Sequence, residues 1–158
     1  GMRVTAVRAH PERRSGEEVD RALGPEDLDD ALADAHYVVL ALAETGESAG
    51  LIDAGTLAGM RPDAVLLNLA RGSIVDEPAL IAALEEGRLR GAALDVFATE
   101  PLPADSPLLR LSNVLATPHA GSVSPRFWER QSDLMADNLA RYLRGEPLRN
   151  LVDRRRGY

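Results

Sequence analysis

The chain has 158 residues, about the length of one domain, and hydrophobic residues make up 45% of it, enough for a globular core. Its formal net charge of -7 argues against a general nucleic-acid binder, because phosphate binding needs a basic surface. No apolar run approaches the roughly 18 to 20 residues that span a membrane, and cysteine is absent, which excludes a disulfide framework and fits a reducing compartment. We therefore expect a soluble, cytoplasmic protein without a leader segment or a membrane partner.

Short apolar segments alternate with helical segments along the chain. The expected strands are apolar runs at residues 3–7, 37–42, 64–69, 91–96 and 113–116. The expected helices lie at residues 24–33, 53–60, 76–87 and about 125–144. Asp53 and Asp76 are suited to cap two of these helices, while Gly87 and Gly145 are suited to end two of them. This alternation predicts βαβ units, and hence an α/β fold with a parallel, Rossmann-like sheet flanked by helices.

The last expected helix carries an apolar stripe. Trp128, Met135, Leu139 and Tyr142 fall on one face at helical spacing. One interpretation is that this face packs on the protein's own sheet. The other is that it is exposed, or is covered by another domain or a partner chain.

Three chemically active side chains follow strands of the expected sheet. Arg71 comes after the strand at 64–69, Glu100 follows the strand at 91–96, and His119 follows the strand at 113–116. Each alone is more often a solvated or structural residue. Because parallel strands end at one edge of the sheet, however, the three can meet in a single crevice. An arginine, a carboxylate and a histidine together can bind an anionic substrate and transfer a proton to it.

The sequence around these residues resembles the D-isomer-specific 2-hydroxyacid dehydrogenases. Three blocks appear in the order found in that family, namely NLARGSIVDE at 68–77, GAALDVFATEPLP at 91–103 and TPHAGS at 117–122. The resemblance covers residues 2 to about 153. The combination of blocks is highly specific, although each block alone is weak.

The resemblance implies a role for each residue of the trio. Arg71 would bind the substrate carboxylate, His119 would act as the acid/base, and Glu100 would hold and polarise His119. It also implies an NAD or NADP cofactor and a small 2-oxoacid or 2-hydroxyacid substrate, with no metal. Asp95 would lie near the nicotinamide amide. The implied cofactor-binding positions are Arg8, Ala43, Leu69, Asp95, His119, Gly121 and Ser122.

The chain departs from the family in length and at two positions. It contains no G-x-G-x-x-G turn and begins as if at the second strand of the dinucleotide-binding domain. We therefore expect residues 1–158 to form a partial dinucleotide-binding domain that lacks the first β-α unit and the substrate domain, with residues 123–145 as a helix leading toward that domain. Gly1 is either a tag remnant before a genuine start, or the chain is a fragment. Ala43 replaces a proline expected beside the adenine, and Glu44 replaces a leucine.

Arg8 follows the first expected strand, where NAD-binding domains carry an acidic residue that binds the ribose hydroxyls. An arginine there, with Arg13 and Arg14 nearby, would attract a 2′-phosphate and favour NADP. The alternative is a basic loop that faces solvent.

Two functions remain open. The first is part of an oxidoreductase that transfers a hydride between NAD(P)H and C2 of a 2-oxoacid, acting as a homodimer, with this chain alone inactive. The second is a non-catalytic, nucleotide-sensing or interaction module of the same fold. The catalytic trio alone does not separate the two.

Overall fold

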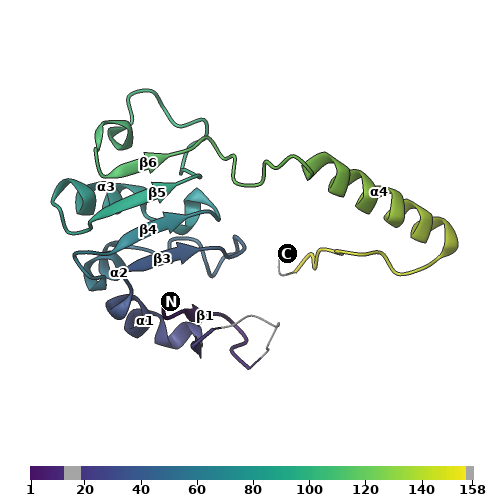
Figure 1. Cartoon of the computed structure of the whole chain (residues 1–158), viewed down its shortest axis with the longest axis horizontal. Helices are drawn as coiled ribbons and strands as arrows, with labels where there is room; N and C mark the ends of the chain where they lie inside the picture. The colour runs from purple at the N-terminus through teal and green to yellow at the C-terminus, as the bar shows by residue number, and fades with distance from the viewer. Residues whose placement is uncertain (13–18, 156–158) are drawn as a thin grey trace.

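The expected α/β class is confirmed in the computed structural model, which describes residues 1–12 and 19–155 (Figure 1). The described strands form two parallel sheets. The smaller sheet pairs β1 (Thr5–Val7) with β2 (Arg21–Leu23). The larger sheet has the order β3-β4-β5-β6, with the bounds Tyr37–Leu40, Val65–Asn68, Gly91–Leu94 and Val114–Ala116.

Two of the four α-helices begin at a side chain that caps them. The helices are α1 (Leu28–Asp34), α2 (Ala54–Gly59), α3 (Glu77–Glu85) and α4 (Phe127–Arg144). The Asp53 carboxylate accepts a hydrogen bond from the Thr56 amide at 2.9 Å, and the Asp76 carboxylate accepts one from the Ala79 amide at 3.1 Å. Both predicted caps are therefore confirmed.

The structure differs from the sequence-based expectation near the N-terminus. Strand β2 was not expected, because its three residues are stabilised by pairing with β1 and show little local pattern. The helix expected at 24–33 begins instead as a 3-10 turn at Pro25–Asp27, and α1 follows it. The other strands are shorter than expected by one or two residues, as is usual at element ends.

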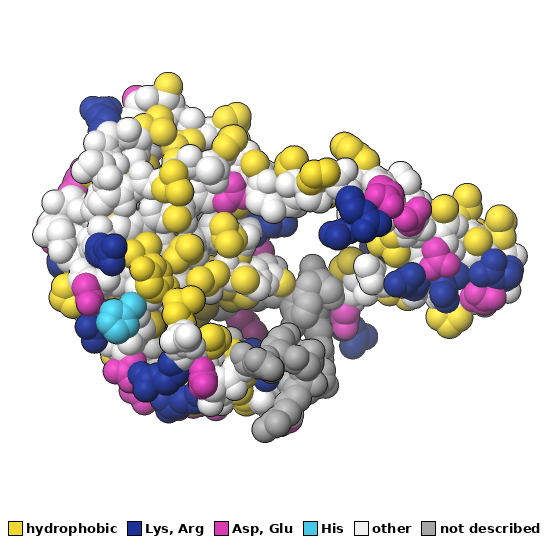
Figure 2. All heavy atoms as spheres, viewed as in Figure 1, with side chains coloured by type: hydrophobic (Ala, Val, Ile, Leu, Met, Phe, Trp, Pro, Cys, Tyr) yellow, Lys and Arg dark blue, Asp and Glu magenta, His cyan; other side chains and the backbone are white. Residues whose placement is uncertain are grey.

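The core lies on one face of the larger sheet. Val38, Leu40, Leu66 and Leu94 alternate along their strands and pack with buried leucines of α1, α2 and α3. The alternate residues face the other way, and they are half-buried in β4 and β5 and exposed in β3 and β6. Tyr37, Val39 and Leu115 have 54%, 55% and 65% of their surface exposed. Figure 2 shows a band of hydrophobic side chains over the strands of this sheet.

The two sheets lie side by side, and the order of their strands can be compared with that of dinucleotide-binding domains. Helix α1 contacts both β1 and α2, which places the smaller sheet beside the β3 edge (Figure 1). Dinucleotide-binding domains have the strand order 3-2-1-4-5-6. The observed strands β2-β1 and β3-β4-β5 correspond to strands 3-2 and 4-5-6 of that series, its strand 1 has no counterpart in the described residues, and β6 is an additional strand beside β5. Within the described residues, no strand joins β1 to β3.

Helix α4 extends away from the sheets (Figure 1), and none of its residues is buried. It ends at Gly145, which has the left-handed φ of 67° that favours glycine. The interpretation that its apolar stripe packs on the protein's own sheet is therefore wrong in this structure. Trp128 is 78% exposed and Met135 is 71% exposed.

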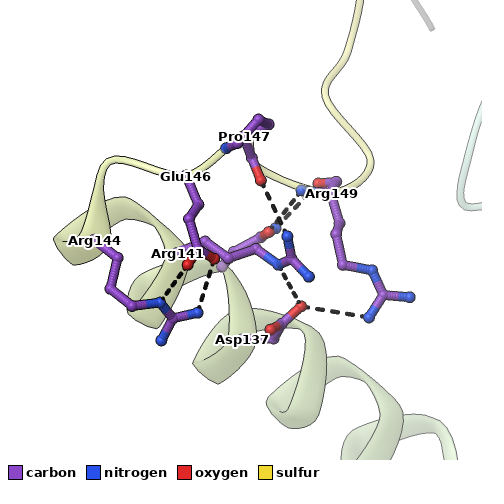
Figure 3. Close-up of polar contacts among 7 residues, drawn as sticks. Asp137, Arg141, Arg144, Glu146, Pro147 and Arg149 are labelled. Atoms are coloured by element: carbon purple, nitrogen blue, oxygen red, sulfur yellow. Dashed lines mark hydrogen bonds and ion pairs between the residues drawn. The ribbon is translucent and has the colours of Figure 1, made fainter.

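Polar contacts fold the chain after α4 back along the helix (Figure 3). The Asp137 carboxylate pairs with Arg141 at 2.9 Å and with Arg149 at 3.3 Å. The Asn138 side chain donates through Nδ2 to the Arg149 backbone carbonyl at 3.1 Å and accepts through Oδ1 from the Arg149 backbone N–H at 2.8 Å. Arg144 pairs with Glu146 at 2.8 Å. These contacts hold the last turn of α4 and residues 146–149 together.

We predict that Leu66→Ala destabilises the protein strongly, whereas Val39→Ala does not. Leu66 is fully buried between sheet and helices, so truncation removes apolar contact and leaves a cavity, at a cost of about 2–5 kcal/mol. Val39 lies on the uncovered face of the neighbouring strand, and its truncation should cost less than about 0.5 kcal/mol. Urea unfolding of both variants measures the difference. Equal losses would show that both faces are covered in solution.

Candidate active site

The parallel register brings the three predicted catalytic loops to one edge of the larger sheet. Asn68 at the end of β4 pairs with Leu94 at the end of β5, and Leu94 pairs with Ala116 at the end of β6. The chain after β4 leads to Arg71, the chain after β5 leads to Glu100, and the chain after β6 leads to His119. The strand ends therefore form one edge that carries all three side chains.

His119 and Glu100 are in direct contact. The His119 Nδ1 atom lies 2.8 Å from Glu100 Oε2, and the two side chains are 43% and 36% exposed. The second carboxylate oxygen, Oε1, accepts a hydrogen bond from the Phe97 amide at 3.0 Å. Glu100 is thus anchored by its own loop while it orients the imidazole, which leaves the Nε2 atom of His119 for a substrate.

Arg71 lies in a loop that packs against the loop leading to Glu100, and Gly72 allows this close approach. A Cβ atom at Gly72 would collide with the backbone of Phe97 and Ala98, so only glycine fits. The Arg71 guanidinium donates through Nη1 to the Ala70 carbonyl at 2.6 Å. Its charge also acts on Glu100. The structure therefore joins His119 to Glu100 directly and places Arg71 at the same edge of the sheet.

The environment favours an ionised Glu100. The contact with His119 lowers the pKa of the Glu100 carboxyl most, and the Phe97 amide lowers it further. The charges of His119 and Arg71 act in the same direction, while burial opposes them. An ionised carboxylate can only accept a hydrogen bond, so it orients the imidazole with a protonated Nδ1 toward Glu100.

Two buried polar residues at strand ends organise the site. Asn68 is 1% exposed, and its side chain donates to the Arg71 carbonyl at 2.8 Å and accepts from the Ala70 amide at 3.0 Å. The sequence interpretation missed this role of Asn68. The available signal was an amide placed inside an otherwise apolar strand, since buried polar groups require partners.

Asp95 lies at the end of β5 and is 6% exposed. Its carboxylate accepts hydrogen bonds from the Thr117 hydroxyl at 2.6 Å, the Ala120 amide at 2.9 Å and the Gly121 amide at 2.7 Å. These donors all belong to the turn that carries His119. The sequence interpretation placed Asp95 beside the cofactor and did not foresee this set of partners.

The other predicted cofactor positions lie in two places. Leu69 and Ala43 follow β4 and β3, Gly121 ends the His119 turn and Ser122 follows it, so all four lie at the strand ends of the larger sheet. Arg8 follows β1 in the smaller sheet, where it is half-buried and its amide donates to the Leu23 carbonyl at 3.0 Å. Arg13 and Arg14 lie outside the described residues.

In the part of the chain that the structure describes, no group of three or more histidine or carboxylate side chains could hold a metal ion. No helix among residues 1–12 and 19–155 is long and apolar enough to cross a membrane.

Comparison with known families agrees with this geometry. Residues 1–121 match the model of the D-isomer specific 2-hydroxyacid dehydrogenase NAD binding domain. The chain belongs to this family. The matched region includes Arg71, Glu100 and His119.

Individual relatives are similar to this chain in both sequence and structure. The chain is 46% identical over 127 residues to glyoxylate/hydroxypyruvate reductase B from Pectobacterium carotovorum, a match that covers 80% of this chain and 40% of that protein. A 2-hydroxyacid dehydrogenase from Xanthobacter autotrophicus, solved with NADPH and MES, is 35% identical with a TM-score of 0.85, covering 99% of this chain and 73% of that one.

A third relative was also solved with a nucleotide. An NADPH-dependent glyoxylate/hydroxypyruvate reductase from Sinorhizobium meliloti, in complex with NADP and sulfate, is 28% identical with a TM-score of 0.87, covering 100% of this chain and 50% of that one. The family member described here therefore spans less than half the length of the curated relatives that it matches, and corresponds to their cofactor-binding part.

We predict that Glu100→Gln lowers stability at neutral pH but has little effect in acid. The pKa of Glu100 is lowered from 4.5, so its ionised form stabilises the folded state above that value. The contribution is lost as pH falls through the lower, folded-state pKa, because the carboxyl is then protonated in both states. Urea unfolding at pH 6 and pH 3 should show a gap between wild type and variant that is smaller at pH 3. A gap of equal size at both pH values would contradict the assignment.

Proposed function

We propose that this chain is the cofactor-binding part of an NAD(P)-dependent reductase of small 2-oxoacids. The observation that carries the proposal is the convergence of Arg71, Glu100 and His119, with His119 Nδ1 2.8 Å from Glu100 Oε2. The names of the relatives support the substrate class, because two of them are glyoxylate/hydroxypyruvate reductases. Both of those substrates carry a carboxylate beside a carbonyl carbon.

Each residue has a distinct task in this proposal. The Arg71 guanidinium binds the substrate carboxylate through two parallel hydrogen bonds, which fixes the carbonyl beside His119. His119 in its protonated form donates a proton from Nε2 to the carbonyl oxygen. Glu100 holds Nδ1 and stabilises the imidazolium before transfer. In the reverse direction, the neutral imidazole accepts the hydroxyl proton.

The described residues fit one end of the nicotinamide cofactor better than the other. When bound, the cofactor supplies the hydride that reduces C2. Asp95, His119, Gly121 and Ser122 lie at the strand ends, where the nicotinamide end is expected. The pyrophosphate normally binds to a glycine-rich turn and a helix N-terminus. The sequence contains no such turn.

The uncovered surfaces support a proposal about domain organisation. Residues 1–158 form a partial dinucleotide-binding domain, and residues 123–145 lead toward a substrate domain. The exposed stripe of α4 and the uncovered face of the sheet, on which Tyr37 and Val39 are exposed, are the surfaces that such a domain, or a second copy in a homodimer, would cover. A cytoplasmic location belongs to the same proposal and is supported by the absence of cysteine.

We predict that the chain supports catalysis only when the rest of the enzyme is supplied. A chimera in which this chain replaces the matched region of the Pectobacterium reductase should reduce glyoxylate or hydroxypyruvate with NADPH. His119→Ala and Arg71→Ala should each lower kcat/KM by at least about 100-fold, since proton transfer and carboxylate binding are each lost. The isolated chain should show no tight NADPH binding by calorimetry.

The outcomes separate the candidate functions. An active chimera with an unaffected His119→Ala variant would disprove the assigned acid/base. A folded chimera that binds NADPH but reduces no 2-oxoacid would favour the non-catalytic, nucleotide-sensing module. Tight NADPH binding by residues 1–158 alone would show that the glycine-rich turn is not the main anchor.

We predict that the same chimera prefers NADPH to NADH because of Arg8. A charge-assisted contact between Arg8 and the 2′-phosphate contributes about 1.5–3 kcal/mol, or one to two orders of magnitude in affinity. Arg8→Asp should reverse the preference, because aspartate repels the phosphate and accepts hydrogen bonds from the ribose hydroxyls. The ratio of kcat/KM for the two cofactors measures this. Equal ratios before and after the substitution would make Arg8 a surface charge only.

A further inference from the structure

We propose that Asp95 is a positioning residue for His119. Its buried carboxylate holds the turn at residues 117–121 in the one conformation that places the imidazole against Glu100. This inference rests on the proposed acid/base role of His119. It goes further by assigning the preorganisation of that histidine to a residue that does not touch it through its side chain.

The first observation is the set of hydrogen bonds on the Asp95 carboxylate. Oδ1 accepts from the Thr117 hydroxyl at 2.6 Å and from the Ala120 amide at 2.9 Å, and Oδ2 accepts from the Gly121 amide at 2.7 Å. The donors stand on both sides of His119 in the chain. The carboxylate therefore closes a loop around the histidine, and these short, charge-assisted bonds are stronger than neutral ones.

The second observation is the backbone of His119 itself. Its φ is 52°, in the left-handed region that side chains other than glycine rarely adopt. Such a conformation persists only where the surrounding contacts impose it. The His119 amide donates to the Asp95 carbonyl at 2.8 Å, so main chain and side chain of Asp95 both act on this turn.

The third observation is the fixed location of Asp95. Its amide donates to the Asn68 carbonyl at 3.0 Å, which ties it to the end of β4 in the core of the sheet. The side chain has little room to move, because a Cβ atom added at Gly121 would lie 2.9 Å from Oδ2. Asp95 therefore transmits the rigidity of the sheet to the turn.

These contacts also limit what else Asp95 can bind. Oδ1 already has two donors, so a nicotinamide amide could reach only Oδ2, which has one. The Thr117 hydroxyl is the largest cause that lowers the pKa of the Asp95 carboxyl, followed among the favourable contacts by the Ala120 and Gly121 amides. The carboxylate is thus kept ionised by the turn that it organises.

The test measures the tautomer of the neutral His119 imidazole in the isolated chain by nitrogen-15 NMR. Glu100 accepts a hydrogen bond from a protonated Nδ1, so the native turn favours the Nδ1–H form. Asp95→Asn, Thr117→Val and Gly121→Ala should each lower the ratio of Nδ1–H to Nε2–H forms by about 3- to 10-fold, as expected for loss of one hydrogen bond. Glu100→Ala serves as the positive control, because it removes the acceptor itself.

Two of these variants separate geometry from charge. Thr117→Val and Gly121→Ala keep the Asp95 charge and alter only its contacts. Asp53→Asn is the matched control, since Asp53 also accepts from a threonine hydroxyl, at 2.8 Å, and from a backbone amide, at 2.9 Å, but caps α2 instead of the His119 turn. It should leave the tautomer ratio unchanged while showing the general effect of losing a capping carboxylate on stability.

The proposal is overturned if Thr117→Val and Gly121→Ala remain folded and keep the wild-type tautomer ratio. It is also overturned if Asp95→Asn changes the ratio no more than Asp53→Asn does. Because the measurement needs no turnover, its result is independent of whether the chimera reduces 2-oxoacids. Absence of turnover together with the expected tautomer changes would refute the proposed function and leave the positioning role intact.

Discussion

The parallel pairing of β4, β5 and β6 is the constraint on which the site depends. Each strand delivers one loop, and the register between strands sets which residues of those loops meet. Arg71, Glu100 and His119 are separated by 29 and 19 residues in sequence, yet they share one edge because all three strands run in the same direction. A parallel sheet can therefore build one site from segments that are far apart in the sequence.

A second principle operates at that edge. Buried polar side chains support the exposed side chains of the candidate site, with Asn68 holding the Arg71 loop and Asp95 holding the His119 turn. The Asp95 amide donates to the Asn68 carbonyl, so the two supports are linked to each other through the sheet. A buried polar group that is fully hydrogen-bonded allows few alternative arrangements, and it therefore gives an exposed catalytic group a defined direction.

Local pattern explains which parts could be predicted from sequence. Asp53 and Asp76 predicted the starts of the helices that they cap, and the apolar runs predicted β3 to β6. Both kinds of signal depend only on residues that are close in sequence. The trio was predicted from family blocks and from the rule that parallel strands end together. Strand β2 was missed because pairing with β1 is a non-local interaction. The partners of Asp95 were missed for the same reason, since they lie 22 to 26 residues away in the chain.

The contacts between α4 and residues 146–149 have a consequence for assembly. Asn138 brackets the Arg149 backbone, and Asp137 joins Arg141 to Arg149, so this region is ordered without support from the sheets. A flexible segment loses conformational entropy when it docks, which weakens its binding. Helix α4 ends at Gly145 and is held by contacts with residues 146–149, so its apolar stripe can dock on a covering surface without first folding. Helix α4 is thus already formed before any surface covers its apolar stripe.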